Sequence, residues 1–187
     1  MNKTTIKTNN DSALINSKVN LRSSSLPAKK EITVLEAFGG EGVLWSKVKK
    51  LHPDKNIKVL SIDKNQYNRI QLQGDNMKYI SGFNLQEFDI IDLYAYGSPV
   101  KQLEIIFAKN YCGIIHCTFI QTMQGNLPKE LLYANGYTDA MLKKIKSIFV
   151  RDGVDKFLNY LAIRGGVKKV NIISSNRKNY LWFNLVN

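Results

Sequence analysis

Residues 31–42 read Glu-Ile-Thr-Val-Leu-Glu-Ala-Phe-Gly-Gly-Glu-Gly, and they are the strongest indication of the fold in this sequence. The apolar run at 32–35 is typical of a short strand, and it ends at the acidic Glu36. A glycine cluster follows at once. Helical spacing of apolar residues then begins at Val43 and continues to Leu51. A strand, a glycine turn and a helix in this order form the first half of a βαβ unit, so the sequence predicts an α/β protein.

The same alternation of strands and helices continues to the end of the chain. We expect further strands at 57–62, 78–80, 88–93, 113–119, 167–174 and 180–186, and helices at 66–73, at 100–109 and from near Asp139 and Asp152. The turn-like residues 175–179 join the last two strands, which predicts a hairpin. The predicted architecture is therefore α/β, with a mostly parallel seven-stranded sheet, a C-terminal β-hairpin and helices on both faces.

The composition restricts the class of protein. The chain has 187 residues, of which 44% are hydrophobic and 22% are charged, as in a globular domain. No run approaches the roughly 18 apolar residues that cross a bilayer, and the start lacks the apolar block of a signal peptide. Cys112 and Cys117 lie in an apolar run without a second pair, so we expect neither a disulfide scaffold nor a metal site. We expect a soluble, cytoplasmic protein.

The formal net charge of +12 is unevenly distributed. Residues 1–30 carry +5 without a sustained apolar period, so we expect a flexible basic N-terminal arm before a single domain over 31–187. Residues 31–142 carry −1, whereas residues 143–178 carry +8. Such asymmetry suggests a surface that faces phosphates, although a solvated lysine surface is the alternative. The bases that we expect to bind nucleic acid, RNA before DNA, are Lys143, Lys144, Lys146, Lys168, Lys169, Arg177 and Lys178.

Acidic residues follow the ends of successive predicted strands. Ligands of such sheets bind at the carboxyl ends of the strands. Glu36 ends the first strand, and Asp63 ends the second, where a carboxylate can take two ribose hydroxyls. Asp75 follows twelve residues later and could accept a hydrogen bond from an adenine amino group. The chain contains neither G-x-G-x-x-G nor G-x-x-x-x-G-K-[ST], which argues against a nicotinamide site and excludes a P-loop.

Residues 34–42 resemble the first motif of class I S-adenosylmethionine (SAM)-dependent methyltransferases, in the D-x-F-x-G-x-G form common among nucleic-acid enzymes. Asp63 matches the family's ribose-binding acid, and Asp75 matches its adenine-contacting acid. The resemblance implies a Rossmann-like methyltransferase fold with SAM as the cofactor. The amino-acid part of the cofactor would lie over the glycines, with Glu36 near its amine. The cofactor-binding residues that it implies are Glu36, Phe38, Gly39, Gly40, Gly42, Asp63 and Asp75.

Residues 88–99 are similar to the fourth motif of that family, and their ending resembles the D-P-[FY]-G-S-P of tRNA guanine-N2 dimethyltransferases. Tyr94 and Ala95 replace the Asp-Pro, whose acid holds the target amino group in that family. Asp92 lies on the same face of the strand as Tyr94, so it could supply a carboxylate from deeper in the sheet, or it is a structural acid. Tyr96 would stack on an extruded base, or it is a core residue. The candidate catalytic residues are thus Asp92, Tyr94 and Tyr96.

Other residues are weaker candidates. We expect His116, inside an apolar strand, to be buried and hydrogen-bonded rather than a base. Cys117 lacks the preceding proline of the cytosine-C5 methyltransferases. Tyr133 and Tyr137 could form part of a substrate lip.

The sequence therefore predicts a SAM-dependent methyltransferase that acts on nucleic acid, first of all on an RNA (tRNA) base amino group. Methyl transfer from a sulfonium needs alignment and exclusion of water more than a strong acid or base, which suits a site with few polar residues. One alternative is a non-catalytic SAM-binding or nucleic-acid-binding module with a degenerate fourth motif. Another is a methyltransferase for DNA, a protein or a small molecule.

Overall fold

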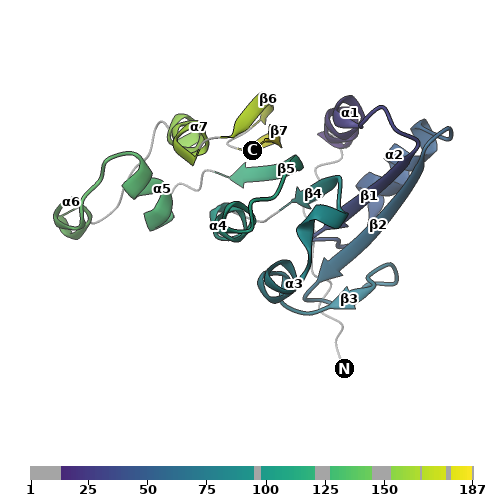
Figure 1. Cartoon of the computed structure of the whole chain (residues 1–187), viewed down its shortest axis with the longest axis horizontal. Coiled ribbons are helices and arrows are strands. Elements are labelled where there is room, and N and C mark those ends of the chain that lie inside the picture. Colours follow the sequence, from purple (N-terminus) through teal and green to yellow (C-terminus); the bar gives the residue numbers. More distant parts are fainter. Residues whose placement is uncertain are drawn as a thin grey trace.

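The computed structural model describes residues 14–94, 98–120, 127–144, 153–164, 166–175 and 178–186. Within these residues, seven strands form one sheet in the order β3-β2-β1-β4-β5-β7-β6 (Figure 1). The strands are β1 (Glu31–Glu36), β2 (Asn56–Asp63), β3 (Leu72–Gln73), β4 (Ile90–Leu93), β5 (Gly113–Ile120), β6 (Val167–Ser175) and β7 (Lys178–Leu185). The first five are parallel to one another, and β7 runs antiparallel to both β5 and β6. The predicted parallel sheet with a C-terminal hairpin is confirmed.

The strand order reverses at β1, which pairs with β2 on one side and with β4 on the other. In open α/β sheets such a reversal leaves a crevice outside the carboxyl ends of the strands, because the connecting helices leave to opposite faces. Glu36 of β1 is the register partner of both Ser61 of β2 and Asp92 of β4. The sequence motif at 34–42 therefore begins at the topological switch point.

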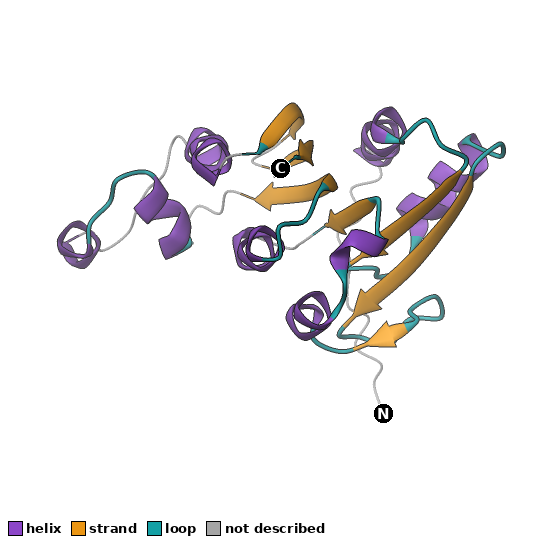
Figure 2. Cartoon of the chain, in the orientation of Figure 1, coloured by secondary structure: helices purple, strands orange, loops and turns teal. Residues whose placement is uncertain are grey.

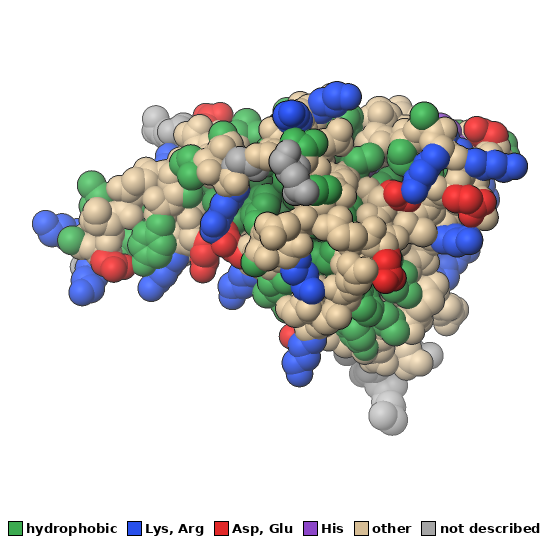
Figure 3. Space-filling model, viewed as in Figure 1, with side chains coloured by type: hydrophobic (Ala, Val, Ile, Leu, Met, Phe, Trp, Pro, Cys, Tyr) green, Lys and Arg blue, Asp and Glu red, His purple; other side chains and the backbone are tan. Residues whose placement is uncertain are grey.

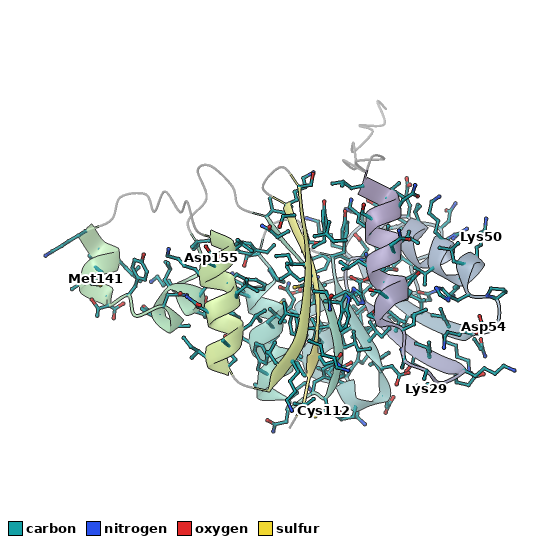
Figure 4. The ribbon with its side chains drawn as sticks, turned by 90° about the horizontal axis from the view of Figure 1, so that it is seen from above. Lys29, Lys50, Asp54, Cys112, Met141 and Asp155 are labelled. Atoms are coloured by element: carbon teal, nitrogen blue, oxygen red, sulfur yellow. The ribbon has the colours of Figure 1, made fainter. Side chains whose placement is uncertain are left out.

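Helices cover both faces of the sheet (Figure 2). Neighbouring residues of a strand point to opposite faces, so Val34 packs in one apolar cluster and Leu35 in the other. The Val34 cluster contains residues of α1 (Ile15–Ser25) and α2 (Val43–Leu51). The Leu35 cluster is larger and contains residues of α3 (Asn76–Gly82), α4 (Val100–Ala108), α5 (Lys129–Ala134) and α7 (Gly153–Arg164). Figure 4 shows α1 and α7 on opposite sides of the β6–β7 hairpin.

The short helices α5 and α6 (Asp139–Lys144) extend away from the sheet beyond the carboxyl end of β5 (Figure 1). None of the six α6 residues is buried. Figure 4 shows Met141 of α6 at one end of the molecule and Lys50 of α2 at the other. No helix in the described part of the chain is long and apolar enough to span a membrane.

Two predicted elements after β2 are wrong. Residues 66–70 form turns instead of a helix, and the predicted strand at 78–80 lies inside α3. The reason is a cap: the Asp75 carboxylate accepts a hydrogen bond from the Met77 amide and so begins a helix where Tyr79 and Ile80 alone favour a strand. The third strand is the two-residue β3 just before that cap.

The expectation of a flexible arm over residues 1–30 is wrong for α1. This helix packs on α2 and on the hairpin, and it buries two cations, Lys18 and Arg22. The sequence of α1 is Ile-Asn-Ser-Lys-Val-Asn-Leu-Arg-Ser-Ser-Ser, which has no continuous apolar stripe. The helix can still pack on the sheet, because its buried polar side chains form hydrogen bonds with polar partners there. The first thirteen residues lie outside the described part of the chain.

Candidate functional site

A cleft of about 950 Å³ opens at the carboxyl edge of the sheet. The loops after β1, β2 and β3 form one half of it, and the ends of β4, β5 and β7 form the other. All seven predicted cofactor-binding residues line this single cleft: Glu36, Phe38, Gly39, Gly40, Gly42, Asp63 and Asp75. The structure therefore brings together the residues that the sequence placed at successive strand ends.

The glycine loop is held against β2 by its backbone. The Gly39 amide donates to the Ile62 carbonyl at 2.9 Å, which brings the loop close enough that a Cβ on Gly39 would lie 2.7–2.8 Å from Ile70 Cδ1 and Ser61 Cβ. Gly42 has a φ of 65°, in the left-handed region that glycine tolerates, and α2 begins at the next residue. These two positions explain why the motif needs glycine.

The Asp63 carboxylate lies between the glycine loop and the following turn. Its Oδ2 accepts from the Gly40 amide at 3.0 Å, and its Oδ1 accepts from the Asn65 amide at 2.8 Å. Each carboxylate oxygen has a second lone pair that a ligand can use. Asp63 is therefore fixed in orientation and can still bind a pair of ligand hydroxyls.

A chain of amides lies beside Asp75. Asn76 donates from Nδ2 to the Ala37 carbonyl at 3.0 Å, and Gln102 of α4 donates from Nε2 to Asn76 Oδ1 at 3.3 Å. This fixes the amide orientation of Gln102, whose buried Oε1 has no hydrogen-bond partner among the described residues although Gln102 lines the cleft. Sequence reasoning missed Gln102, because a single glutamine on a helix gives no signal.

Glu36 lies at the base of the cleft and is 4% exposed. It accepts a hydrogen bond from the Ser61 hydroxyl at 2.7 Å. Burial, followed by the nearby Asp92 carboxylate, raises the pKa of Glu36 to about 8 against the opposing effects of Ser61 and Arg22. The Glu36 carboxyl is thus mostly protonated at neutral pH in the free protein, and a cation bound next to it would favour its ionised form.

Asp92 does not line the cleft, and the prediction that it acts on a substrate is wrong. It is fully buried, and Arg22 of α1 donates to it twice, from Nε at 2.7 Å and from Nη2 at 3.0 Å. Trp45 of α2 donates to the same carboxylate at 2.8 Å. The alternative of a structural acid is correct: Asp92 fixes α1 and α2 to the sheet.

A second polar contact of α1 reaches the cleft through Tyr94. The Lys18 ammonium donates to the Tyr94 hydroxyl at 2.6 Å, and the Tyr94 ring stacks on Tyr180 with centroids 6.1 Å apart. Burial is the main cause that raises the pKa of Tyr94, so its phenol stays protonated. Tyr94, a candidate catalytic residue, lines the cleft, whereas Tyr96 lies outside the described residues.

The interpretation of His116 is confirmed. The side chain is 1% exposed, and its Nε2 shares a hydrogen bond of 2.7 Å with Ser25 of α1. Burial and then the Arg22 charge lower the pKa of His116 well below its usual value, so the ring is neutral and supports α1. Cys117 is also buried, and burial raises the pKa of its thiol, which excludes a reactive thiolate.

Among the described residues, the predicted bases do not all lie near the cleft. Lys178 lines the cleft and pairs with Ile120 at the carboxyl end of β5. Lys168 pairs with Asn184 at the other end of the hairpin, and at about 3.3 Å per residue this is roughly 20 Å away. Lysine and arginine side chains are scattered over the face shown in Figure 3. Lys169 lies beside Lys168, Lys143 and Lys144 are exposed on α6, and Lys146 and Arg177 lie outside the described residues.

The predicted substrate lip is not part of the cleft lining. Tyr133 is 45% exposed on α5, where its hydroxyl donates to Asp139 at 2.7 Å. Tyr137 packs against the larger apolar cluster. The residues that sequence reasoning missed at this end of the cleft are Thr118, Ile120 and Tyr180, together with Lys18 behind them.

No family model matches the sequence, and no curated protein does either. Solved structures match it over most of its length. Human N-acetylserotonin methyltransferase in complex with SAM is 16% identical with a TM-score of 0.50, and the match covers 94% of this chain and 52% of that chain. A candidate exported protein of Bordetella parapertussis is 8% identical with a TM-score of 0.57, and the match covers 92% and 67% of the two chains.

PigF with SAH is 11% identical with a TM-score of 0.48, covering 95% of this chain and 60% of that chain. The chain thus spans between about half and two thirds of the length of these proteins. Together with the strand order and the antiparallel last strand, the likeness to the human enzyme shows that this chain has the Rossmann-like methyltransferase fold.

Proposed function

We propose that the protein is a SAM-dependent methyltransferase. The observation that carries this proposal is the single cleft at the switch point, in which the glycine loop, Glu36, Asp63 and Asp75 meet. Asp63 would take the ribose hydroxyls and Asp75 the adenine amino group. The backbone at Gly39 and Gly40 would lie under the amino-acid part of the cofactor, with Glu36 near its amine. The residues present fit the cofactor in their hydrogen-bonding capacity.

The charge of this half of the cleft also fits. SAM carries a sulfonium and an ammonium group, and the residues around the glycine loop include the carboxylates of Glu41, Asp63 and Asp75 against one lysine, Lys64, while the Glu36 carboxyl is mostly protonated in the free protein. A cleft lined mainly by one sign of charge raises the local concentration of a ligand of the opposite sign. A cationic nucleoside is therefore favoured over a nucleotide that carries phosphates.

The reaction needs little acid–base chemistry from the protein. The cofactor supplies an electrophilic methyl group, and the residues of this chain orient the two reactants and exclude water. The protonated phenol of Tyr94 and the apolar side chain of Ile120 line the region where an acceptor would lie. A site of this kind can be active although Asp92 is sealed beneath α1.

We further propose nucleic acid as the acceptor, RNA before DNA, with a base amino group as the methylated position. The net charge of +12 supports this, as do Lys178 at the cleft and the exposed Lys143 and Lys144 on α6, which extends from the carboxyl edge of the sheet (Figure 1). Cations that neutralise phosphates release counterions, so binding should fall steeply as salt is raised.

A small-molecule acceptor is the second candidate. The position of Lys168 and Lys169 at the opposite end of the hairpin favours it, because these charges cannot hold a phosphate at the cleft. The human structural neighbour is named for a small acceptor, N-acetylserotonin. The third candidate is a module that binds SAM without transferring a methyl group. It is favoured by the position of Asp92 in the fourth motif, because this carboxylate does not line the cleft.

Isothermal calorimetry with SAM and with S-adenosylhomocysteine (SAH) tests the cofactor. We expect saturable binding that weakens at least tenfold in Asp63→Ala and is unchanged in Asp54→Ala, which removes an exposed carboxylate from the turn before β2 (Figure 4). Absence of binding to the wild-type protein would refute the proposal. Transfer of radiolabelled methyl to bulk RNA, bulk DNA or a small-molecule extract then separates the acceptors, and binding without any transfer favours the module.

A further inference from the structure

The cleft has a second half with a different chemistry. Its lining comes from the ends of β4, β5 and β7 and consists of Tyr94, Thr118, Ile120, Lys178 and Tyr180. These residues lie side by side, because Thr118 pairs with Tyr180 and Ile120 pairs with Lys178 across the β5–β7 ladder. We call these five residues the tyrosine end of the cleft.

The tyrosine end carries positive charge. Lys178 lies in its lining, and the Lys18 ammonium lies behind the rings, 5.1 Å from the Tyr94 centroid and 4.9 Å from the Tyr180 centroid. Asp92, the acid on the same face of the sheet, is already bound by Arg22. Because the five lining residues include no carboxylate, an anion at this end meets the Lys178 ammonium group and no like charge from the lining, with the buried Lys18 ammonium group behind the rings.

One buried polar group at the tyrosine end has no partner. Thr118 is 2% exposed, and its Oγ1 makes no hydrogen bond with any residue that the structure describes. Buried hydroxyls are hydrogen-bonded in the large majority of native proteins, since an unsatisfied one destabilises the fold. Thr118 lines the cleft, so a ligand that enters there can supply the missing partner.

The size of the cleft leaves room for a second molecule. Its volume of about 950 Å³ is near the upper end of the range for ligand pockets. The glycine-loop half accounts for a nucleoside cofactor, so the tyrosine end is where the acceptor would lie. Tyr94 and Ile120 offer an apolar wall against which a flat ring can pack.

Building on the proposed methyltransferase function, we propose that the tyrosine end binds the methyl acceptor as a planar ring that carries an anionic oxygen group. The ring packs against Tyr94 and Ile120, Thr118 donates its hydroxyl hydrogen to the acceptor, and Lys178 pairs with the anion. In the transfer, a lone pair of the acceptor forms the bond to the methyl carbon, the electron pair of the broken carbon–sulfur bond stays on sulfur, and the proton of the acceptor leaves to water.

Two sources share this chemistry: a free aromatic acid, and a nucleotide with its phosphate. The experiment measures binding of matched probes to the SAH-loaded protein by calorimetry. One pair is 3,4-dihydroxybenzoate and its neutral amide, and the other is guanosine 5′-monophosphate and guanosine. We expect the anionic member of at least one pair to bind ten or more times tighter than its neutral partner. Preference confined to one pair identifies the source.

Variants locate the effect. Lys178→Met should reduce the preference for the anion to less than twofold, whereas Lys168→Met, at the other end of the hairpin, should retain it. Thr118→Val should weaken binding of both members of a pair, and Thr118→Ser, which keeps the hydroxyl, should restore it. SAH affinity should be unchanged in all four variants, which shows that each one folds.

The outcomes separate the two proposals. Equal binding of anionic and neutral probes, or no binding of any probe to protein that does bind SAH, overturns the anionic acceptor and leaves the methyltransferase proposal standing. An anion preference that survives Lys178→Met also overturns it. Failure of SAH itself to bind refutes the proposed function, and the acceptor inference falls with it.

Discussion

The glycine-loop half of the cleft takes its residues from loops that each directly follow a strand, whereas the tyrosine end takes its residues from β4, β5 and β7 and is supported from behind by α1. The first half is held by backbone hydrogen bonds, such as that from the Gly39 amide to the Ile62 carbonyl. The second is held by buried side chains, Lys18 and Arg22, that reach across the sheet surface. Local sequence therefore specifies one half, and tertiary packing specifies the other.

The difference predicts where each kind of mutation acts. Changes in α1 should unfold the tyrosine end or the whole domain, because α1 contributes buried charges. Changes in the glycine loop should reduce cofactor affinity in a protein that remains folded, because that loop lies at the surface of the cleft.

The largest expected effect is on stability. Arg22→Met keeps the side-chain volume but leaves the fully buried Asp92 without its ion pair, which should lower the free energy of unfolding by about 3–5 kcal/mol. Urea unfolding followed by circular dichroism measures this. The matched control is Arg164→Met, which removes a half-exposed ion pair to Glu104 and should cost less than about 1 kcal/mol. Equal losses in the two variants would show that α1 is not held by the buried pair.

The second effect is on the pH dependence of cofactor binding. Because the pKa of Glu36 is raised to about 8 in the free protein, its carboxylate is scarce at pH 6 and abundant above pH 8. SAM affinity should therefore rise with pH on the order of tens of fold between pH 6 and 8, and binding at pH 7 should release a proton. Calorimetry in two buffers of different ionisation enthalpy detects the proton, and Glu36→Gln should abolish both effects.

The raised pKa of Glu36 also affects the free energy of unfolding, and here the contribution of Glu36 falls as pH rises. The folded protein holds the Glu36 proton more tightly than the unfolded chain, in which the carboxyl has a pKa of about 4.5. The stability that Glu36 contributes is thus fully present below about pH 4.5 and is lost as pH rises through about 8. A contribution of Glu36 that grows with pH over this range, in comparison with Glu36→Gln, would contradict its burial as a protonated acid.

A smaller loss of affinity is expected in the glycine loop. Gly39→Ala places a methyl group 2.7–2.8 Å from Ile70 Cδ1 and Ser61 Cβ, so the loop must move away from β2. The displaced loop would no longer lie where the cofactor needs it, and we expect a roughly tenfold loss of SAM affinity, which corresponds to about 1.4 kcal/mol. Gly82→Ala is the control, because a Cβ there meets no atom within 4 Å. Calorimetry that finds equal SAM affinity in both variants would mean that the cofactor does not touch the loop.

The smallest effect on SAM affinity is expected at Tyr94. Tyr94→Phe keeps the ring that stacks on Tyr180 but removes the oxygen that accepts from Lys18, so unfolding should become easier by about 1–3 kcal/mol. SAM affinity should stay within about twofold, because Tyr94 belongs to the other half of the cleft. A larger loss of SAM affinity, measured by the same titration, would show that the two halves of the cleft do not act separately.

The sequence was sufficient for the glycine-loop half because its signals are local. A strand that ends in Glu36, a glycine cluster, and acids at the next two strand ends require only that parallel strands share one edge. Asp63 and Asp75 therefore lie where the pattern predicted, although Asp75 also caps α3 and so displaced the predicted third strand.

The tyrosine end could not be predicted from the sequence in the same way. Hydrophobic periodicity finds helices that bury apolar faces, and α1 buries Lys18, Arg22 and Ser25 through polar partners that lie 70 or more residues away. The structural role of Asp92 could not be predicted either, because it depends on the ion pair with Arg22 of α1. Lys168 and Lys178 are ten residues apart in the sequence, but they lie on different strands, at opposite ends of the β6–β7 hairpin.

The crystal structure of the protein with SAH tests the central claim most directly. We predict that the ribose hydroxyls lie within hydrogen-bonding distance of the Asp63 carboxylate, with the adenine beside Asp75 and the homocysteine over Gly39 and Gly40. Density for SAH elsewhere on the protein, or a bound SAH that makes no contact with Asp63, would contradict it.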